Sequence, residues 1–217
     1  PGTHYWYSLS HDVLAAIAEV ITGQTFEEYV SEWIFRPLGL TEIAYNFNES
    51  NRKKLIPQYM TTNGEAPLVP IGGENPYIFS KNYYSGGAGM IGRAEDYTRI
   101  LSALSQGKLL KKETLELMKT NQLDETRLAD LRKTPWLAGH GYGLGVRTLM
   151  DPAKVDYTAP VGEIGWDGAA GAFALVDSDR ELAIGYFQQV RHCQYAYNVV
   201  HPKVRALVYE ALGYTFK

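Results

Sequence analysis

The spacing of apolar residues changes along this chain, and this change constrains the fold more than any other feature. Between residues 10 and 36, and again between 94 and 120, apolar residues recur every three or four positions, as on one face of a helix. After Trp136 the pattern becomes that of short strands. Helices followed by a sheet and a last helix predict an α+β fold rather than a βαβ repeat.

Two helices are predicted close to the beginning of the chain. The first has a serine as its cap, ends at Gly23, and is apolar at every third or fourth position, namely at Val13, Leu14, Ile17, Val20 and Ile21. The second begins with a capping box formed by Thr25 and Glu28 and ends before Pro37. Further helices are predicted at 94–105, 113–120 and 202–212.

The second half of the chain is predicted to contain an antiparallel sheet. One strand is expected over residues 142–149, and two more at 172–176 and 182–188. The polar turn at 177–180 joins the last two and predicts a hairpin. We therefore expect a mostly helical lobe at 1–134, which includes a long irregular loop at 44–84, and a lobe of strands and a C-terminal helix at 135–217.

Composition excludes several classes of function. The 217 residues carry a net charge of −3, which disfavours nucleic-acid binding. No apolar run approaches the roughly 20 residues of a membrane span. The single cysteine and five histidines lack metal-ligand spacing, so neither a metal nor another cofactor is expected. Because the chain begins without Met, we interpret it as a piece of a longer polypeptide, and its compartment stays undetermined.

A serine nucleophile activated by lysine requires the pattern Ser-x-x-Lys, in which the amine lies one helical turn from the hydroxyl. The pattern occurs at Ser50–Lys53 and at Ser105–Lys108. The first lies in a very polar stretch, and the second contains Gly107, where a helix ends. Neither is expected to be catalytic, since a nucleophile must be held rigidly by packing.

Three groups of motifs, in order, resemble the serine β-lactamase and penicillin-binding-protein superfamily. The first contains Pro1-Gly2-Thr3, Tyr7-Ser8-Leu9, Thr22-Gly23 and Pro37-Leu38-Gly39. The second is Ser85-Gly86-Gly87-Ala88-Gly89-Met90, and the third is Gly165-Trp166-Asp167-Gly168-Ala169 with the hairpin that follows. The resemblance covers nearly the whole chain and implies a β-lactamase/transpeptidase-like fold, with a cleft between a helical lobe and an α/β lobe.

The resemblance implies two catalytic groups in this chain. A tyrosine at the position of Tyr7 takes a proton from the nucleophilic serine in this family. A phenol is a poor base at its usual pKa of about 10, so a neighbouring lysine cation would have to favour its phenolate. The backbone N–H of Ala169 would form half of an oxyanion hole.

Four residues are expected to contact substrate, and three of them depart from the β-lactamase pattern. Leu9 replaces a hydrogen-bonding asparagine, and Trp166 and Asp167 replace the lysine and threonine that precede Gly168. The lysine cation that holds a β-lactam carboxylate is then absent, and the next residue, Asp167, carries a carboxylate of its own. An aromatic wall favours an uncharged acyl or alcohol group, as in the esterases related to class C β-lactamases.

The nucleophile and its lysine are expected outside this chain, because the family carries them upstream of the tyrosine. These residues alone are then expected to be inactive, with an unpaired sheet edge that takes an N-terminal segment or leads to self-association. The expected substrate is a small acyl ester or a peptide-like molecule.

Two alternative functions remain open. One is a β-lactamase or D-amino-acid peptidase in which Arg191 or Lys81 replaces the lost cation, and the other is a binding protein that kept the fold without the chemistry. His140, His192 and Cys193 are expected to be structural.

Overall fold

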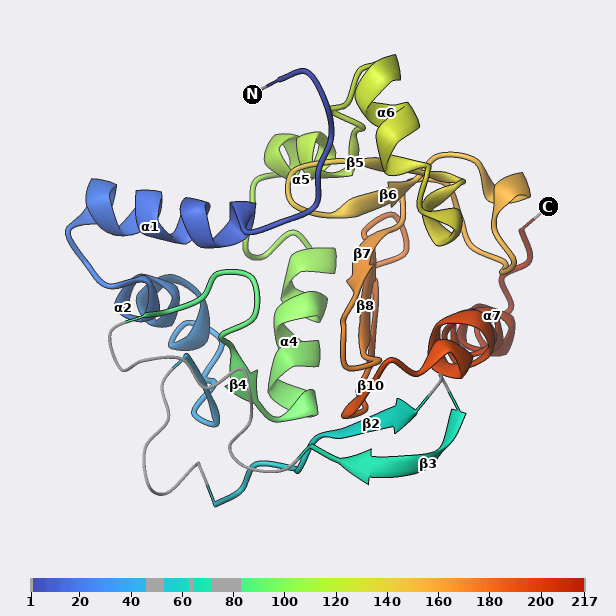
Figure 1. The fold of residues 1–217 in the computed structure, drawn as a ribbon. Coiled ribbons are helices and arrows are strands. Elements are labelled where there is room, and N and C mark those ends of the chain that lie inside the picture. The colour runs from blue at the N-terminus through green and yellow to red at the C-terminus, as the bar shows by residue number, and fades with distance from the viewer. Residues whose placement is uncertain (1, 46–52, 63–64, 72–82, 217) are drawn as a thin grey trace.

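An antiparallel sheet forms the centre of the computed structural model, which describes residues 2–45, 53–62, 65–71 and 83–216 (Figure 1). Its strands are neighbours in space in the order of the sequence. They are β5 (His140–Tyr142), β6 (Arg147–Leu149), β7 (Ile164–Asp167), β8 (Phe173–Asp177) and β9 (Leu182–Tyr186). The predicted hairpin is confirmed, since β8 and β9 pair from Phe173 opposite Tyr186 to Asp177 opposite Leu182.

Helices cover both faces of this sheet because the side chains of β8 alternate between two apolar layers. Phe173 and Leu175 face α7 (His201–Ala211), where they meet Val204 and Val208. Val176, on the opposite face, packs with Leu101 of α4 (Ala94–Ser105). The arrangement of α4, sheet and α7 is visible in Figure 1. The predicted α+β fold is therefore confirmed.

The two predicted N-terminal helices are present. Helix α1 (Ser10–Thr22) ends at Gly23, whose φ of 69° lies in the left-handed region that glycine favours. Helix α2 (Phe26–Val30) begins with the predicted capping box and continues as a π-helical turn, Ser31–Phe35. The predicted serine cap of α1 is wrong: the cap position is Leu9, which makes no side-chain hydrogen bond.

The remaining helices and the first strands of the sheet differ in part from the prediction. Helices α4, α5 (Lys112–Lys119) and α7 confirm it, whereas α6 (Glu125–Leu131) was not expected. The predicted strand at 142–149 is wrong, because Gly145, with a φ of 79°, turns the chain between β5 and β6. Single 3-10 turns lie at Pro135–Leu137 and Pro152–Lys154.

The segment at 44–84 contains strands where an irregular loop was expected. In its described part, β2 (Tyr59–Thr62) and β3 (Glu65–Pro70) form a hairpin, and β10 (Val190–Arg191) pairs with β2 in parallel. The short strands β1 (Ile43–Ala44) and β4 (Ile91–Gly92) also pair. The hairpin thus joins the C-terminal part of the chain, so the lobe boundary at residue 134 stays a prediction.

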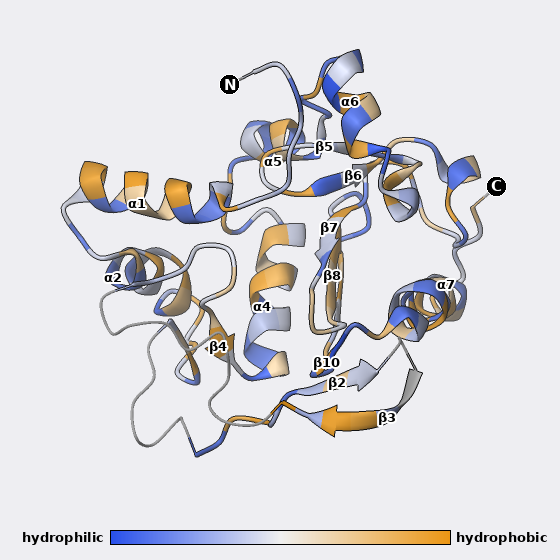
Figure 2. Cartoon of the chain, in the orientation of Figure 1, coloured by the Kyte–Doolittle hydropathy of each residue, from blue (hydrophilic) through white to orange (hydrophobic). Residues whose placement is uncertain are grey.

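Helix α1 carries many hydrophobic residues (Figure 2), and much of its apolar face is exposed. Val20 is 85% exposed and Ile21 is 78% exposed, and Val13 and Ile17 are exposed on the preceding turns. Strand β9, at one edge of the central sheet, pairs with β8 alone among the described residues. None of the helices described here has the length and apolar character needed to cross a membrane.

The capping of the two N-terminal helices gives a stability prediction. Thr25→Ala removes the side-chain oxygen that accepts from the Glu28 N–H at 3.2 Å and should lower the free energy of unfolding by about 1 kcal/mol. Ser10→Ala is the matched control and should change it by less than about 0.5 kcal/mol, since no serine caps α1. Urea unfolding measures both, and an equal loss in the two variants would contradict this assignment.

Candidate active site

Tyr7 and Trp166, which sequence reasoning assigned to one site, lie in direct contact. Their rings stack with centroids 4.9 Å apart and planes 16° from parallel. Trp136 and Tyr142 meet the Trp166 ring edge-on, at 5.5 Å and 5.8 Å. These four residues are named the aromatic cluster below. It joins the segment before α1 to strands β5 and β7, which are far apart in the sequence.

The outer side of the aromatic cluster is open to solvent. Tyr7 is 57% exposed, and Leu9, at the cap position of α1, is 69% exposed. Tyr142 lies deeper: burial, with a smaller contribution from Tyr7, raises the pKa of Tyr142 to about 12. Tyr142 therefore remains a neutral phenol at physiological pH, which leaves Tyr7 as the accessible phenol of the cluster.

The segment that carries Tyr7 is fixed on both sides. Before it, the carboxylate of Asp130 accepts from His4 Nδ1 at 2.8 Å and from the Tyr5 N–H at 3.2 Å. Hydrogen bonds from Lys133 and His4 lower the pKa of Asp130 to about 2, so it is ionised. After it, the His11 ring lies 3.1 Å from the Gly145 carbonyl oxygen. The segment that carries Tyr7 is thereby fixed to α6 on one side and to the β5–β6 turn on the other.

The glycine-rich segment after Tyr83 packs against the start of α1. Ser85 and Tyr83 donate to the Asp12 carboxylate at 2.6 Å and 2.7 Å. The α-carbon of Gly86 lies so close to the His11 carbonyl that a side chain would collide with it. The second of the family-like motifs is therefore fixed to the helix that follows the first.

A tight turn at residues 168–171 follows Trp166 on the same strand. The Gly168 N–H donates to the Ala172 carbonyl at 2.7 Å, and the Gly171 N–H donates to the Gly168 carbonyl at 2.9 Å. Gly171 has a φ of 82° and lies against the Gln188 side chain. In the part of the chain that is described, the N–H groups of Ala169 and Ala170 have no hydrogen-bond partner, and Ala169 is exposed. The turn therefore offers two backbone donors to a ligand.

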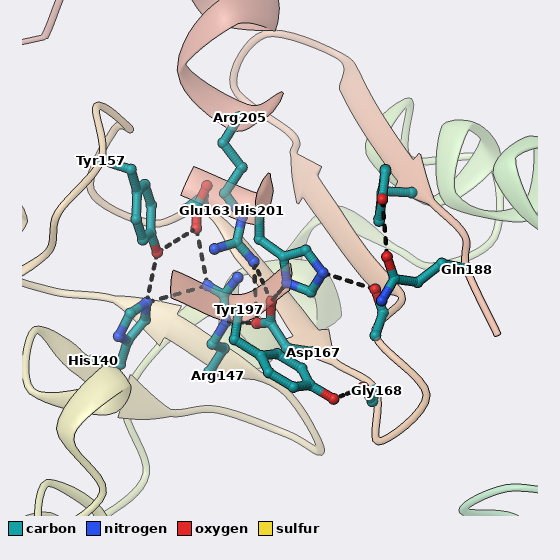
Figure 3. Close-up of polar contacts among 12 residues, drawn as sticks. His140, Arg147, Tyr157, Glu163, Asp167, Gly168, Gln188, Tyr197, His201 and Arg205 are labelled. Atoms are coloured by element: carbon teal, nitrogen blue, oxygen red, sulfur yellow. Dashed lines mark hydrogen bonds and ion pairs between the residues drawn. The ribbon is translucent and has the colours of Figure 1, made fainter. Parts of the chain in front are cut away.

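Asp167 lies in a buried ionic network (Figure 3) rather than beside the aromatic wall, where the sequence placed its carboxylate. Arg205 Nη2 donates to both of its oxygens, at 2.8 Å and 3.0 Å, and Arg147 Nε donates at 3.2 Å. Burial opposes ionisation, but the arginines and His201 hold the pKa of Asp167 far below its usual range. Gly168, also predicted to bind substrate, has both backbone groups bonded within the protein.

The network continues behind the strand through groups that are almost entirely buried. Arg147 Nη1 donates to Glu163 Oε1 at 2.9 Å and lies 3.2 Å from His140 Nε2. Since a guanidinium cannot accept, Nε2 is the acceptor and the neutral His140 ring carries its proton on Nδ1. Burial, followed by Arg147, lowers the pKa of His140 to about 3. The geometry therefore gives His140 a structural function in the neutral form.

The other two residues left without a function by the sequence lie at the end of β10. His192 has a φ of 59°, and its carbonyl accepts from the Thr61 hydroxyl at 2.8 Å, which ties it to β2. Cys193 is a partly exposed free thiol. Neither residue contacts the aromatic cluster in any described interaction.

Of the two internal Ser-x-x-Lys patterns, Ser105–Lys108 lies within the described residues and does not form a catalytic pair. Ser105 is buried at the end of α4 and donates to the Ser102 carbonyl at 2.9 Å. Lys108 is exposed beyond Gly107, whose left-handed conformation ends the helix. Ser50 lies outside the described residues, as does Lys81. No group of three potential metal ligands is found in the described part of the chain.

Sequence reasoning did not find the buried partners of Asp167, which are Arg147, His201 and Arg205. Their signal was a charged residue inside an otherwise apolar element, as in Val146-Arg147-Thr148-Leu149. A buried charge requires a partner of opposite sign, so such a residue indicates a network even when its partners are unknown.

Comparisons with known proteins agree with this geometry. The fold is β-lactamase/transpeptidase-like: unliganded simvastatin synthase of Aspergillus terreus superposes with a TM-score of 0.80 at 19% identity, over 97% of this chain and 56% of that one. The Beta-lactamase family model matches residues 1–196. The chain therefore belongs to the Beta-lactamase family, as its motifs indicated.

Two curated relatives show the range of this similarity. Esterase EstB of Burkholderia gladioli is 30% identical over 198 residues, which cover 85% of this chain and 49% of EstB. A putative D-alanyl-D-alanine carboxypeptidase of Escherichia coli O157:H7 is 23% identical over 210 residues, which cover 85% of this chain and 44% of that protein. The chain spans about half the length of these relatives.

The pKa of His140 predicts how stability depends on pH. The folded protein keeps this ring neutral down to about pH 3, whereas the unfolded chain protonates it near pH 6.5. The unfolded state thus binds the extra proton between these values, and stability falls as the pH falls, by up to about 1.4 kcal/mol per pH unit.

His140→Gln should remove the contribution of His140 to the pH dependence of the unfolding free energy between pH 7 and 5. This holds even if the substitution changes the stability by a constant amount at every pH. His4→Gln, at an exposed imidazole, is the control for the loss of a histidine. Denaturant unfolding at several pH values measures the slopes. Parallel curves for wild type and His140→Gln would show that the ring does not stay neutral in the folded protein.

Proposed function

We propose that this chain is the part of a serine hydrolase that supplies the general base and an oxyanion donor for the cleavage of uncharged esters through an acyl-enzyme. The observation that supports this most directly is the stack of Tyr7 on Trp166 at 4.9 Å, with the Ala169 N–H three residues further along. A phenol, an aromatic wall and an unpaired backbone donor are the groups that acyl transfer to a serine requires beside the nucleophile.

In the proposed reaction, the serine oxygen attacks the ester carbonyl carbon while its proton passes to the Tyr7 phenolate. The carbonyl oxygen becomes an oxyanion and accepts from the Ala169 N–H. Collapse of this intermediate expels the alcohol, which takes the proton back from Tyr7. Water then attacks the acyl-enzyme by the same route, which releases the acid and restores the serine.

The nucleophilic serine and its lysine are proposed to come from a segment of the complete protein outside these 217 residues. Two observations support this. The Ser105 pattern is buried without its lysine, and the chain spans about half the length of its curated relatives. By itself the chain is then expected to hydrolyse nothing.

The expected substrate is an ester whose acyl group carries no charge. Trp166, Trp136 and Tyr142 offer apolar ring surface, and the Asp167 carboxylate is occupied by arginines behind the strand. The similarity to an esterase agrees with this choice. Leu9, exposed two residues after Tyr7, is proposed to line the same side.

One observation favours a second candidate, recognition of a β-lactam or a D-amino-acid peptide. Arg191 follows Val190, whose N–H donates to the Ala170 carbonyl of the turn at 3.0 Å. The cationic residue Arg191 is therefore next to a residue that is hydrogen-bonded to the turn. The similarity to a putative carboxypeptidase agrees with recognition of a peptide carboxylate. A chromogenic cephalosporin compared with p-nitrophenyl esters separates the two candidates.

A third candidate, a non-catalytic binding protein, is distinguished by covalent labelling of the complete gene product. A fluorophosphonate adduct on a serine outside these residues supports the hydrolase. A complete product that contains no Ser-x-x-Lys and forms no adduct supports the binding protein.

Tyr7→Phe tests the proposed base in the complete gene product. The variant keeps the ring that stacks on Trp166 and removes only the hydroxyl, so kcat for p-nitrophenyl esters should fall about 10²- to 10⁴-fold. Tyr29→Phe, in the separate Tyr29–Trp33 pair, is the control and should hydrolyse the esters at the wild-type rate. Near-normal hydrolysis by Tyr7→Phe would exclude the phenol as the base.

We also propose that the rest of the complete protein covers the apolar face of α1. Val20→Lys should then lower the stability of the complete gene product by at least about 2 kcal/mol, because it places a charge in an apolar contact. Leu207→Lys, at a residue that is 60% exposed on α7, should have little effect. Since Val20 is the more exposed of the two in this chain, small effects in both variants would show that α1 is uncovered.

A further inference from the structure

Three side chains at a spacing of four residues hold the turn at 168–171 from behind. Tyr197, His201 and Arg205 lie at i, i+4 and i+8 along the π-helical turn Ala196–Val200 and α7, which are continuous. This spacing places them on one side of the helix. Figure 3 shows all three directed toward Asp167 and the turn.

Each side chain bonds a different part of the turn or the residue before it. The Tyr197 hydroxyl donates to the Gly168 carbonyl at 2.9 Å. His201 Nε2 lies 2.8 Å from the Gly171 carbonyl, and Nδ1 lies 2.8 Å from Asp167 Oδ1. Together with Arg205 on the same carboxylate, these contacts fix both ends of the turn while Ala169 stays exposed between them.

The two contacts of His201 determine its protonation state. A carboxylate and a carbonyl oxygen are both acceptors, so both ring nitrogens must carry a proton for both bonds to form. The ring is fully buried, and the aromatic rings of Phe173, Tyr186 and Tyr197 surround it at 4.9 Å, 5.5 Å and 5.3 Å. The Asp167 carboxylate, 2.8 Å from Nδ1, supplies the negative charge that a cationic ring requires in this buried position.

We propose that His201, as a doubly protonated imidazolium between Asp167 and Gly171, acts with Tyr197 as a positioning residue that fixes the oxyanion turn. This proposal rests on the proposed function, because it concerns the turn that presents the Ala169 N–H. A donor that is already aimed at the developing oxyanion stabilises the transition state more than the bound substrate, so loosening the turn lowers kcat and leaves KM nearly unchanged.

The first measurement is independent of activity. In 15N-labelled complete gene product at neutral pH, the nitrogen and proton shifts of the His201 ring, assigned with His201→Phe, should show a proton on each nitrogen. A ring that carries one proton overturns the proposal. Because this measurement needs no substrate, it separates a failure of the proposal from a failure of the hydrolase function.

The second measurement compares kinetics. His201→Phe keeps an aromatic ring at this position and removes both N–H donors. Tyr197→Phe removes a single hydroxyl, and it tests the proposal if His201→Phe does not fold. Both should lower kcat for p-nitrophenyl esters, about 10- to 100-fold for the histidine variant and less for the tyrosine, with KM within about threefold. Rates are expressed per serine that reacts with fluorophosphonate, so that only folded sites are counted.

Tyr195→Phe is the matched control, because Tyr195 lies on the same helical stretch and is 62% exposed. This variant should hydrolyse esters at the wild-type rate. The Ala169 amide shift should move in His201→Phe and Tyr197→Phe and stay in place in Tyr195→Phe. Folded variants with an unchanged Ala169 amide and unchanged kcat would overturn the proposal. Loss of thermal stability with unchanged kcat per reactive serine would do so as well, since it indicates a merely structural contact.

Discussion

The buried charge of Asp167 is the interaction on which the rest of this structure depends. A carboxylate with 7% of its side chain exposed requires cations, and it obtains them from β6 and α7, two elements almost 60 positions apart in the sequence. Arg147 then requires the second carboxylate, Glu163. The sheet and the last helix are thus joined by a set of buried charges in which removal of any one leaves its partners with less compensating charge.

Strand β7 connects this ionic network to the candidate site. Successive side chains of a strand point to opposite faces, so Trp166 faces the aromatic cluster while Asp167 faces the arginines. One residue therefore forms the wall of the proposed site and the next anchors that wall to the core. In the turn that follows, Tyr197 and His201 bond the carbonyls of Gly168 and Gly171, while the N–H groups of Ala169 and Ala170 make no described hydrogen bond.

Local signals predicted much of the fold, and long-range contacts explain what they missed. The Thr25–Glu28 capping box and Gly23 marked helix boundaries correctly, since caps depend on neighbours in the sequence. The pairing of β2 with β10 was missed because the two strands lie about 130 residues apart, whereas the pairing of β2 with β3 is local. The motif order grouped Tyr7 with Trp166, whose rings are in contact, but it carried no information on which side of the strand Asp167 would point. Its carboxylate was therefore expected at the substrate, whereas it lies in the core.

The position of α7 late in the chain has a consequence for how the protein is made. Residues 164–171 leave the ribosome well before Tyr197, His201 and Arg205, and a nascent chain without α7 holds Asp167 with one arginine and no histidine. Because that carboxylate is stable in the core only with its cations, the turn cannot take its final form during synthesis of the sheet. The turn at 168–171 therefore reaches its final form only after α7 has left the ribosome, about 30 residues after its own strand.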